Sequence, residues 1–268
     1  MISFASDYIA GAHPAILKRL AETNRESLTG YGTDIYCESA KEKIKAACEC
    51  PEAEVYFLVG GTQTNQVIIS TMLKPYEGVI SADTGHVNAH EAGAIEYTGH
   101  KVLALPAVNG KLEAKMVAGY IQSFYEDESH EHMVFPGMVY LSHPTEYGTL
   151  YSRKELQAIS EICRSYEIPL YLDGARLGYG LAGEENDLSL SEIAHLCDVF
   201  YIGGTKCGAL FGEALVITEA SLQYRFKAYM KQHGAVLAKG WLMGLQFALM
   251  LESGEYFEKT KQADEFAM

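Results

Sequence analysis

The sequence has few basic residues, no long apolar run and no basic leader followed by an apolar stretch. Lys and Arg number 21 against 35 Asp and Glu, which gives a formal charge of −14. A nucleic-acid-binding protein needs a surplus of basic residues, so we expect no nucleic-acid partner. No segment reaches the roughly 18 consecutive apolar residues of a transmembrane helix. The amino terminus does not resemble a signal peptide, and we expect no membrane partner.

The sequence also lacks an ordered set of cysteines. The pair Cys48 and Cys50 is spaced too closely for the usual zinc knuckle, and no His pair follows at zinc-finger spacing. A chain of 268 residues can bury a core without disulfides, so we expect reduced thiols, a cytoplasmic location and no metal site. The cysteines are Cys37, Cys48, Cys50, Cys163, Cys197 and Cys207.

Short apolar segments alternate with amphipathic ones along the chain. The predicted strands are 55–59, 78–82, 101–105, 138–142, 170–173 and 199–202. The predicted helices are 13–25, 38–49, 62–73, 86–97, 113–125 and 153–166, and the polar run 126–131 is predicted to be an exposed loop. Apolar strands separated by helices of about 10–15 residues predict an α/β fold with a mostly parallel central sheet flanked by helices.

Three polar segments follow predicted strands: 60–65, 173–176 and 203–206. Ligands of open α/β sheets bind beyond the carboxyl ends of the strands, so these segments predict the site. The turn Gly60-Gly61-Thr62 opens a helix whose free N–H groups suit an anion, although the same turn also fits an ordinary Thr-capped helix start. Its spacing matches neither the dinucleotide nor the nucleoside-triphosphate fingerprint, which disfavours a nicotinamide-dependent dehydrogenase.

Three charged residues complete this set. Asp173 ends an apolar strand, where a carboxylate needs a partner or caps a helix. Arg176 either neutralises Asp173 or captures a carboxylate with two parallel hydrogen bonds. Lys206 has apolar neighbours, which favour an uncharged, nucleophilic amine over a solvated surface lysine.

Together these residues suit pyridoxal 5′-phosphate (PLP). This cofactor needs a phosphate cradle, here Gly61 and Thr62, an acid beside its pyridine nitrogen, here Asp173, and a lysine for its aldehyde, here Lys206. A flat side chain usually covers the ring, and His86 or His90 is a candidate for this position.

The same residues carry a resemblance that runs through essentially the whole chain. The sequence resembles the threonine aldolase family, within the aromatic amino acid β-eliminating lyase/threonine aldolase group of fold-type-I PLP enzymes. The matching stretches are Ser6-Asp7, Gly30-Tyr31-Gly32-Thr33-Asp34, Gly60-Gly61-Thr62-Gln63-Thr64-Asn65, Gly85-His86 with Glu91-Ala92-Gly93, Asp173-Gly174-Ala175-Arg176-Leu177 and Gly204-Thr205-Lys206.

The resemblance implies a role for each cofactor-binding residue. Gly61 and Thr62 would hold the phosphate, and His86 would stack on the ring. Asp173 would bond the ring nitrogen, and Lys206 would form the Schiff base with the cofactor aldehyde.

The resemblance also implies substrate contacts and an assembly. Arg176 would bind a cofactor oxygen or the substrate carboxylate, and Ser6 would help to hold that carboxylate. The family forms homodimers within homotetramers, with sites at the subunit interface. Tyr31, and basic residues such as Lys231, would therefore contact substrate or cofactor in the neighbouring subunit's site.

The implied reaction is cleavage of a β-hydroxy-α-amino acid, threonine or allo-threonine, to glycine and an aldehyde. A base must accept the β-hydroxyl proton, and His86 is the first candidate and His132 the second. PLP-dependent β-elimination and racemisation start in the same way and remain alternatives. A non-catalytic PLP-binding or interaction protein is the alternative of another class.

One large domain and the start of a carboxyl-terminal segment are expected. Residues 1–250 would form the PLP-binding large domain with its amino-terminal arm, and the apolar run from Trp241 to Met250 would pack in its core or in an oligomer contact. Residues 251–268 would start a shortened carboxyl-terminal segment, with a polar helix at 255–268. Members of the family continue into a small domain that supplies another arginine, so we expect PLP binding with impaired catalysis.

Overall fold

The computed structural model describes residues 5–252 and 254–267. Seven strands form one sheet: β1 (Glu54–Leu58), β2 (Glu77–Ala82), β3 (Val102–Leu105), β4 (Phe135–Ser142), β5 (Leu170–Asp173), β6 (Val199–Gly203) and β7 (Glu213–Ile217). The α-helices are α1 (Pro14–Thr23), α2 (Ile35–Ala47), α3 (Gly61–Met72), α4 (His86–Ala89), α5 (Ala94–Tyr97), α6 (Ala114–Glu126), α7 (Arg153–Ser165), α8 (Leu177–Ala182), α9 (Leu190–Leu196), α10 (Phe226–Gln232), α11 (Trp241–Glu252) and α12 (Glu255–Ala267).

The sheet has the strand order β1-β7-β6-β5-β4-β2-β3. Only β7 pairs in the antiparallel sense, with β1 and with β6, so the other six strands point the same way. The mostly parallel sheet is therefore confirmed, and all six predicted strands are present. Residues 213–217 were not predicted as a strand, but they form a fully buried β7 between β1 and β6.

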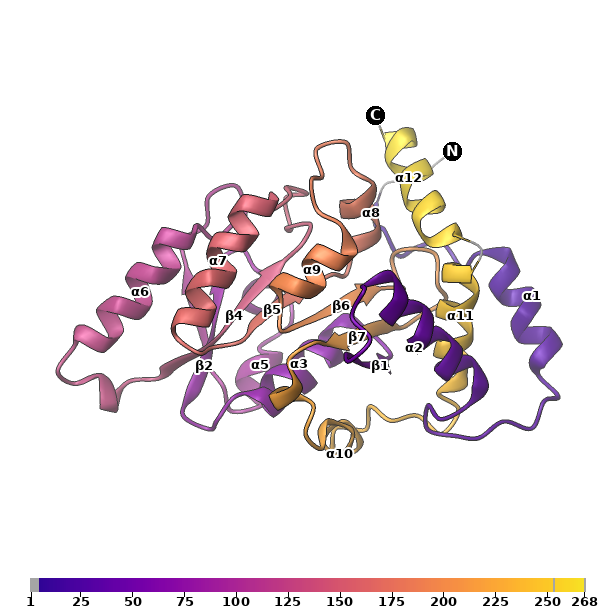
Figure 1. The fold of residues 1–268 in the computed structure, drawn as a ribbon, viewed down its shortest axis with the longest axis horizontal. Coiled ribbons are helices and arrows are strands. Elements are labelled where there is room, and N and C mark those ends of the chain that lie inside the picture. The colour runs from indigo at the N-terminus through magenta and orange to yellow at the C-terminus, as the bar shows by residue number, and fades with distance from the viewer. Residues whose placement is uncertain (1–4, 253, 268) are drawn as a thin grey trace.

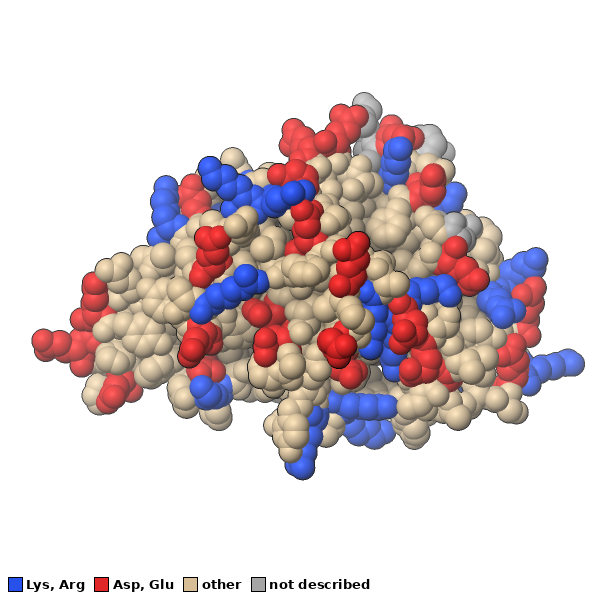
Figure 2. Space-filling view, in the orientation of Figure 1, with Lys and Arg blue, Asp and Glu red and all other residues tan. Residues whose placement is uncertain are grey.

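Helices cover both faces of the sheet. Successive strand residues point to opposite sides, so each strand packs against both helix layers. In β4, Val139 and Leu141 pack with the apolar residues of α2, α6, α7, α9 and α11. Met138 and Tyr140 of the same strand pack with α3, α4, α5 and α10. The result is a three-layer α/β fold (Figure 1). Acidic and basic side chains are interspersed over the face seen in Figure 2.

The predicted helix 86–97 is wrong as a continuous element. The chain forms two short helices, α4 and α5, and the backbone between them turns at Ala92 and Gly93, which have φ angles of 52° and 72°. This left-handed turn interrupts the helical hydrogen bonds and leaves Glu91, only 6% exposed, directed into the protein.

The carboxyl-terminal helices pack against the rest of the fold. The residues Met243, Leu245, Phe247 and Met250 of α11 are buried within this chain, which is one of the two positions predicted for them, the core or an oligomer contact. In α12, Tyr256 is buried against α8, and its hydroxyl donates a 3.0 Å hydrogen bond to the carbonyl of Gly203. The last residue of the predicted helix 255–268 lies outside the described residues. Within the parts of the chain that the structure describes, no helix combines the length and apolar character needed to cross a bilayer.

The contact between α2 and α11 depends on a glycine. A Cβ atom at Gly244 would lie 2.5 Å from the Cα and the Sγ of Cys37. We expect Gly244→Ala to lower the free energy of unfolding by about 1–3 kcal/mol, because backbone must shift to relieve the overlap. Gly119, in the middle of α6 with open space around it, is the matched control. Gly119→Ala should raise stability by about 0.5–1 kcal/mol in the same urea titration, so equal effects of the two changes would contradict this assignment.

Candidate active site

A cavity of about 260 Å³ lies at the carboxyl end of the parallel strands. Six of the predicted site residues line it together: Gly61, Thr62, His86, Asp173, Arg176 and Lys206. The other lining residues are Tyr8, Val59, Gly60, Glu91, Ser142, Pro144, Glu146, Ala175, Tyr201, Thr205 and Glu213. Most of these residues lie at or after the carboxyl ends of β1, β2, β4, β5 and β6, so the parallel strands bring these distant segments to one end of the sheet.

The amino terminus of α3 opens into this cavity. Gly60 is its N-cap, and no side chain caps the helix there. The first N–H groups and the positive end of the helix dipole therefore face the cavity, where they suit an anion. A Cβ at Gly61 would lie 3.0 Å from the hydroxyl of Tyr201, so glycine keeps this wall open. These features fit a phosphate group.

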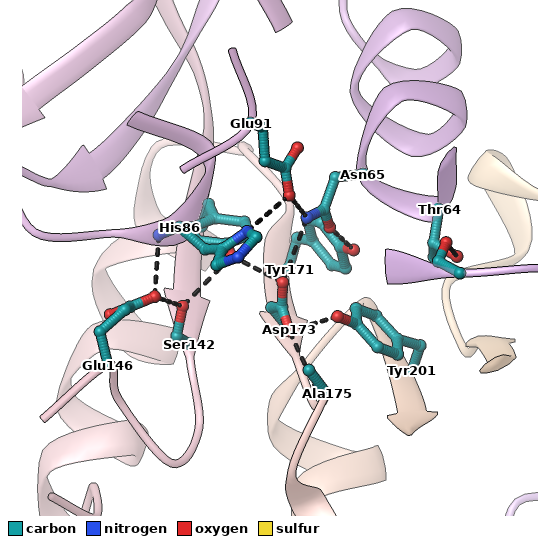
Figure 3. A network of polar contacts seen from close by, with 12 residues as sticks. Thr64, Asn65, His86, Glu91, Ser142, Glu146, Tyr171, Asp173, Ala175 and Tyr201 are labelled. Atoms are coloured by element: carbon teal, nitrogen blue, oxygen red, sulfur yellow. Dashed lines mark hydrogen bonds and ion pairs between the residues drawn. The ribbon is translucent and has the colours of Figure 1, made fainter. Parts of the chain in front are cut away.

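Asp173 is the centre of the polar network in Figure 3. It is only 5% exposed and accepts four hydrogen bonds. Tyr201 Oη and the backbone N of Ala175 donate to Oδ1, while Tyr140 Oη (2.7 Å) and Asn65 Nδ2 (3.2 Å) donate to Oδ2. For the pyridine N–H of PLP to donate to Asp173, one of these donors would have to move. Tyr201 is the side-chain donor that lines the cavity. The carboxylate is thus held in place and fits a partner of positive charge.

The network continues from Asp173 to His86 through two buried side chains. Asn65 Nδ2 also donates to Glu91 Oε1 at 2.6 Å, and the same oxygen lies 2.8 Å from His86 Nδ1. The hydrogen bond with Glu91 raises the pKa of His86 against the opposing effect of burial, and the charge of Asp173 adds to the rise. The imidazole is therefore fixed in orientation and biased toward its protonated form.

Removing the carboxylate at position 91 should reverse this shift. We expect the pKa of His86 in Glu91→Gln to fall to its ordinary value of about 6.5 or below, since burial would then dominate. The measurement is an NMR titration of the His86 ring resonances. Glu96→Gln, an exposed position on α5, is the control and should leave the titration unchanged. An unaltered pKa of His86 in Glu91→Gln would show that the contact does not set its charge.

Three buried tyrosines surround Asp173: Tyr140, Tyr171 and Tyr201. Burial, and then the charge of Asp173, raises the pKa of each hydroxyl well above its usual value. They therefore remain protonated donors. Tyr171 donates to Asn65 Oδ1, which sets the orientation of the Asn65 amide so that its Nδ2 faces Asp173 and Glu91.

Lys206 lies in the turn after β6, and its backbone is held from two sides. Tyr179 donates a 2.7 Å hydrogen bond to the carbonyl of Lys206. Glu213, on the unpredicted strand β7, accepts hydrogen bonds from Thr205 Oγ1 (2.7 Å) and from the backbone N of Gly204 (3.0 Å). Burial raises the pKa of Glu213 to about 7 despite these bonds. The turn is therefore rigid where the lysine enters the cavity.

Arg176 already has a partner in the amino-terminal arm. Its Nε and Nη2 donate to the carboxylate of Asp7, so this pair must open or share before Arg176 can bind a ligand carboxylate. Ser6 does not line the cavity in this chain; Tyr8 does. The arm thus reaches the site through residues other than the one predicted.

The remaining predicted residues lie elsewhere in the fold. His90 is exposed and outside the cavity lining, so His86 is the histidine placed beside Asp173. His132 is an exposed residue at the end of a 3-10 helix before β4, outside the cavity lining of this chain, so its role as a base stays a prediction. Tyr31 lines a second cavity of about 240 Å³, and Lys231 Nζ lies 4.6 Å from its ring centre.

Several residues of the site were not singled out from the sequence. Ser142 ends β4 and Glu146 follows it, so both lie at a strand end of the kind that predicted the other site residues. Glu91 and Asn65 lay inside matched motifs without an assigned role. Glu213 had no signal, because its strand was not predicted.

The fold and the cavity define a class of enzyme. Aspartate aminotransferase from Thermus thermophilus superposes with a TM-score of 0.73 at 14% identity, covering 97% of this chain and 68% of that one. This likeness shows the fold alone, which is that of the fold-type-I PLP enzymes. The amino end of α3, the Asp173 carboxylate and Lys206 on one cavity fit the phosphate, ring nitrogen and aldehyde of that cofactor.

Closer similarities identify the family. The sequence profile of the β-eliminating lyase family matches residues 3–265, and this chain belongs to that family. The low specificity L-threonine aldolase of Pseudomonas aeruginosa is 30% identical over 267 residues, covering 98% of this chain and 75% of that protein. The solved structure of Leishmania major threonine aldolase superposes with a TM-score of 0.96 at 44% identity, over 100% of this chain and 77% of that one.

Proposed function

We propose that this protein is a PLP-dependent aldehyde-lyase that cleaves threonine or allo-threonine to glycine and an aldehyde. The single observation that supports it most is the cavity shared by Asp173, Lys206 and the amino end of α3. The names of the similar proteins support the substrate class.

The chain's own residues would hold the cofactor as follows. The N–H groups at the start of α3, with Thr62, bind the phosphate. Asp173 keeps the ring nitrogen protonated, and His86 covers the ring. Lys206 provides the amine that bonds the aldehyde. When bound, PLP supplies a ring that withdraws electrons from the bonds of the substrate Cα.

Substrate binding would involve Arg176 and a second subunit. The guanidinium of Arg176 suits the substrate carboxylate once Asp7 yields it. Tyr31 and Lys231, whose side chains contact each other away from this cavity, would face the site of a neighbouring subunit in a homodimer or homotetramer.

The test is a product analysis with purified, PLP-loaded protein. We expect threonine or allo-threonine to yield glycine and acetaldehyde in equal amounts. Serine and tyrosine serve as comparison substrates. Pyruvate as the main product would instead establish β-elimination, and appearance of the opposite enantiomer would establish racemisation. If no substrate is turned over although PLP binds, the protein is a non-catalytic PLP binder.

A further inference from the structure

Glu146 is a cavity residue with one carboxylate oxygen in use and one free. Its Oε1 accepts hydrogen bonds from the backbone N of His86 (2.8 Å) and from Ser142 Oγ (2.6 Å). Its Oε2 is buried and has no hydrogen-bond partner among the described residues. Figure 3 shows Glu146 and Glu91 on opposite sides of His86.

A buried carboxylate oxygen without a donor is costly, because it loses its hydration and gains nothing in return. Glu146 lines the cavity, so this atom points to a ligand that reaches Glu146 and brings a hydrogen-bond donor. Glu91 also has an unpaired oxygen, but its other oxygen pairs with the His86 imidazole, which neutralises its charge. Glu146 has no cationic partner of this kind among the described ion pairs.

The position of Glu146 relative to Arg176 indicates which part of a ligand it meets. Burial lowers the pKa of Arg176, but the nearby carboxylates of Asp7, Asp173 and Glu146 outweigh this and raise it. Glu146 is thus a charged neighbour of the residue proposed to bind the substrate carboxylate. In a β-hydroxy amino acid whose carboxylate is bound by Arg176 and whose Cα lies near Lys206, the β-hydroxyl is a further hydrogen-bond donor that needs an acceptor.

His86 is the residue that the sequence predicted first as the base. Its Nδ1 is engaged by Glu91, and this contact raises the pKa of the imidazole, so Nε2 is the ring nitrogen left for a ligand. Its backbone N–H orients Glu146. The Ser142 hydroxyl, the second donor to Glu146 Oε1, lies 3.2 Å from Tyr140 Oη, which in turn bonds Asp173. Glu146 is therefore held by the same network that holds the ring-binding carboxylate.

We propose that Glu146 binds the β-hydroxyl of the substrate through Oε2 and accepts its proton as the Cα–Cβ bond breaks. This role rests on the proposed aldehyde-lyase function. The hydroxyl O–H bond breaks, its proton goes to Glu146, and its electron pair forms the C=O bond of the aldehyde. The electron pair of the Cα–Cβ bond ends in the C–H bond formed at Cα with one proton. Glu146 then returns to its charged form, and no proton is gained or lost overall.

The test compares two reactions of the same PLP-loaded protein. One is threonine cleavage, and the other is exchange of the glycine Cα proton in D₂O, followed by NMR, which involves no β-hydroxyl. We expect Glu146→Gln to lower kcat/KM for cleavage by about 10²–10⁴-fold, the usual contribution of a general base, and to leave glycine exchange at the wild-type rate. Tyr147→Phe, at an exposed neighbouring position, is the matched control and should change neither reaction.

A structural role for Glu146 gives different results. The Gln side chain keeps an oxygen for the His86 and Ser142 donors and removes an unpaired buried charge. We therefore expect the thermal midpoint of the cofactor-free protein not to fall. A lower midpoint with both reactions reduced together would overturn the proposal, as would unchanged cleavage. Ser142→Ala, which removes one of the bonds to Oε1, gives a second test and should slow cleavage alone by about tenfold.

Failure of the proposed function is distinguishable from failure of this role. A wild-type protein that exchanges the glycine proton but cleaves no β-hydroxy amino acid would overturn the aldehyde-lyase function, and the role of Glu146 with it. If Glu146→Gln cleaves threonine at the wild-type rate, the role of Glu146 is overturned and the aldehyde-lyase function still stands.

Discussion

Lys206→Ala is expected to abolish covalent attachment of PLP and to reduce threonine cleavage by about 10²–10⁴-fold or more. The physical reason is that the amine both bonds the cofactor aldehyde and is placed to move protons at the substrate Cα. Lys206 lines the cavity, and its backbone is held by Tyr179 and by the turn that Glu213 fixes. The side-chain amine is therefore the part of Lys206 that can move.

Borohydride reduction followed by peptide mass mapping measures this attachment directly. The wild-type peptide that contains Lys206 should gain the mass of the reduced cofactor, and Lys206→Ala should show no labelled peptide. Lys154→Ala, at an exposed position on α7, is the control and should be labelled at Lys206 like the wild type. Labelling of a different lysine in the wild-type protein would show that the assignment of Lys206 is wrong.

Asp173→Asn is the second substitution with a large expected effect. Each carboxylate oxygen accepts two hydrogen bonds from the protein, and an amide NH₂ at either position would face two donors. The change also removes the negative charge that would keep the cofactor ring nitrogen protonated. A hydrogen bond to a charged group contributes about 1.5–3 kcal/mol, so we expect PLP affinity to fall by roughly 10–150-fold and cleavage to fall further.

Absorbance titration of the cofactor-free protein with PLP measures the affinity, and urea denaturation measures the accompanying loss of stability. The matched control is Asp198→Asn, at the opposite edge of the sheet, where one carboxylate oxygen accepts a hydrogen bond from the backbone N of Leu170. The Asn oxygen can keep that bond, so PLP affinity should be unchanged. Wild-type PLP affinity in Asp173→Asn would contradict the role given to this carboxylate.

The arrangement around Asp173 shows how the fold makes a buried charge tolerable. A carboxylate that is nearly inaccessible to water is stabilised by three neutral side-chain donors and one backbone N–H. Because burial raises the pKa of Tyr140 and Tyr201, their hydroxyls stay protonated and act as donors to the carboxylate. The negative charge is therefore kept at the carboxyl end of β5 for a cationic partner.

Much of the architecture was predictable from local patterns. The six parallel strands are short apolar runs bounded by polar or glycine-rich segments, and their carboxyl ends carry Asp173, the Gly60-Gly61 turn and Lys206. The strand β7 was not predicted, although it pairs with the nearby β6 as well as with β1, which is more than 150 positions away. The break between α4 and α5 was missed because the helical apolar spacing continues across it.

The sequence by itself determined the class of fold and which chemical groups follow the strands, because both depend on the order of residues within short segments. Only the tertiary structure decided how those groups are paired. Asn65 meets Asp173, Glu91 meets His86, Asp7 meets Arg176, and one oxygen of Glu146 is left without a donor. These contacts are set by the packing of helices and loops on the sheet edge, where small changes in backbone direction decide which donor reaches which acceptor.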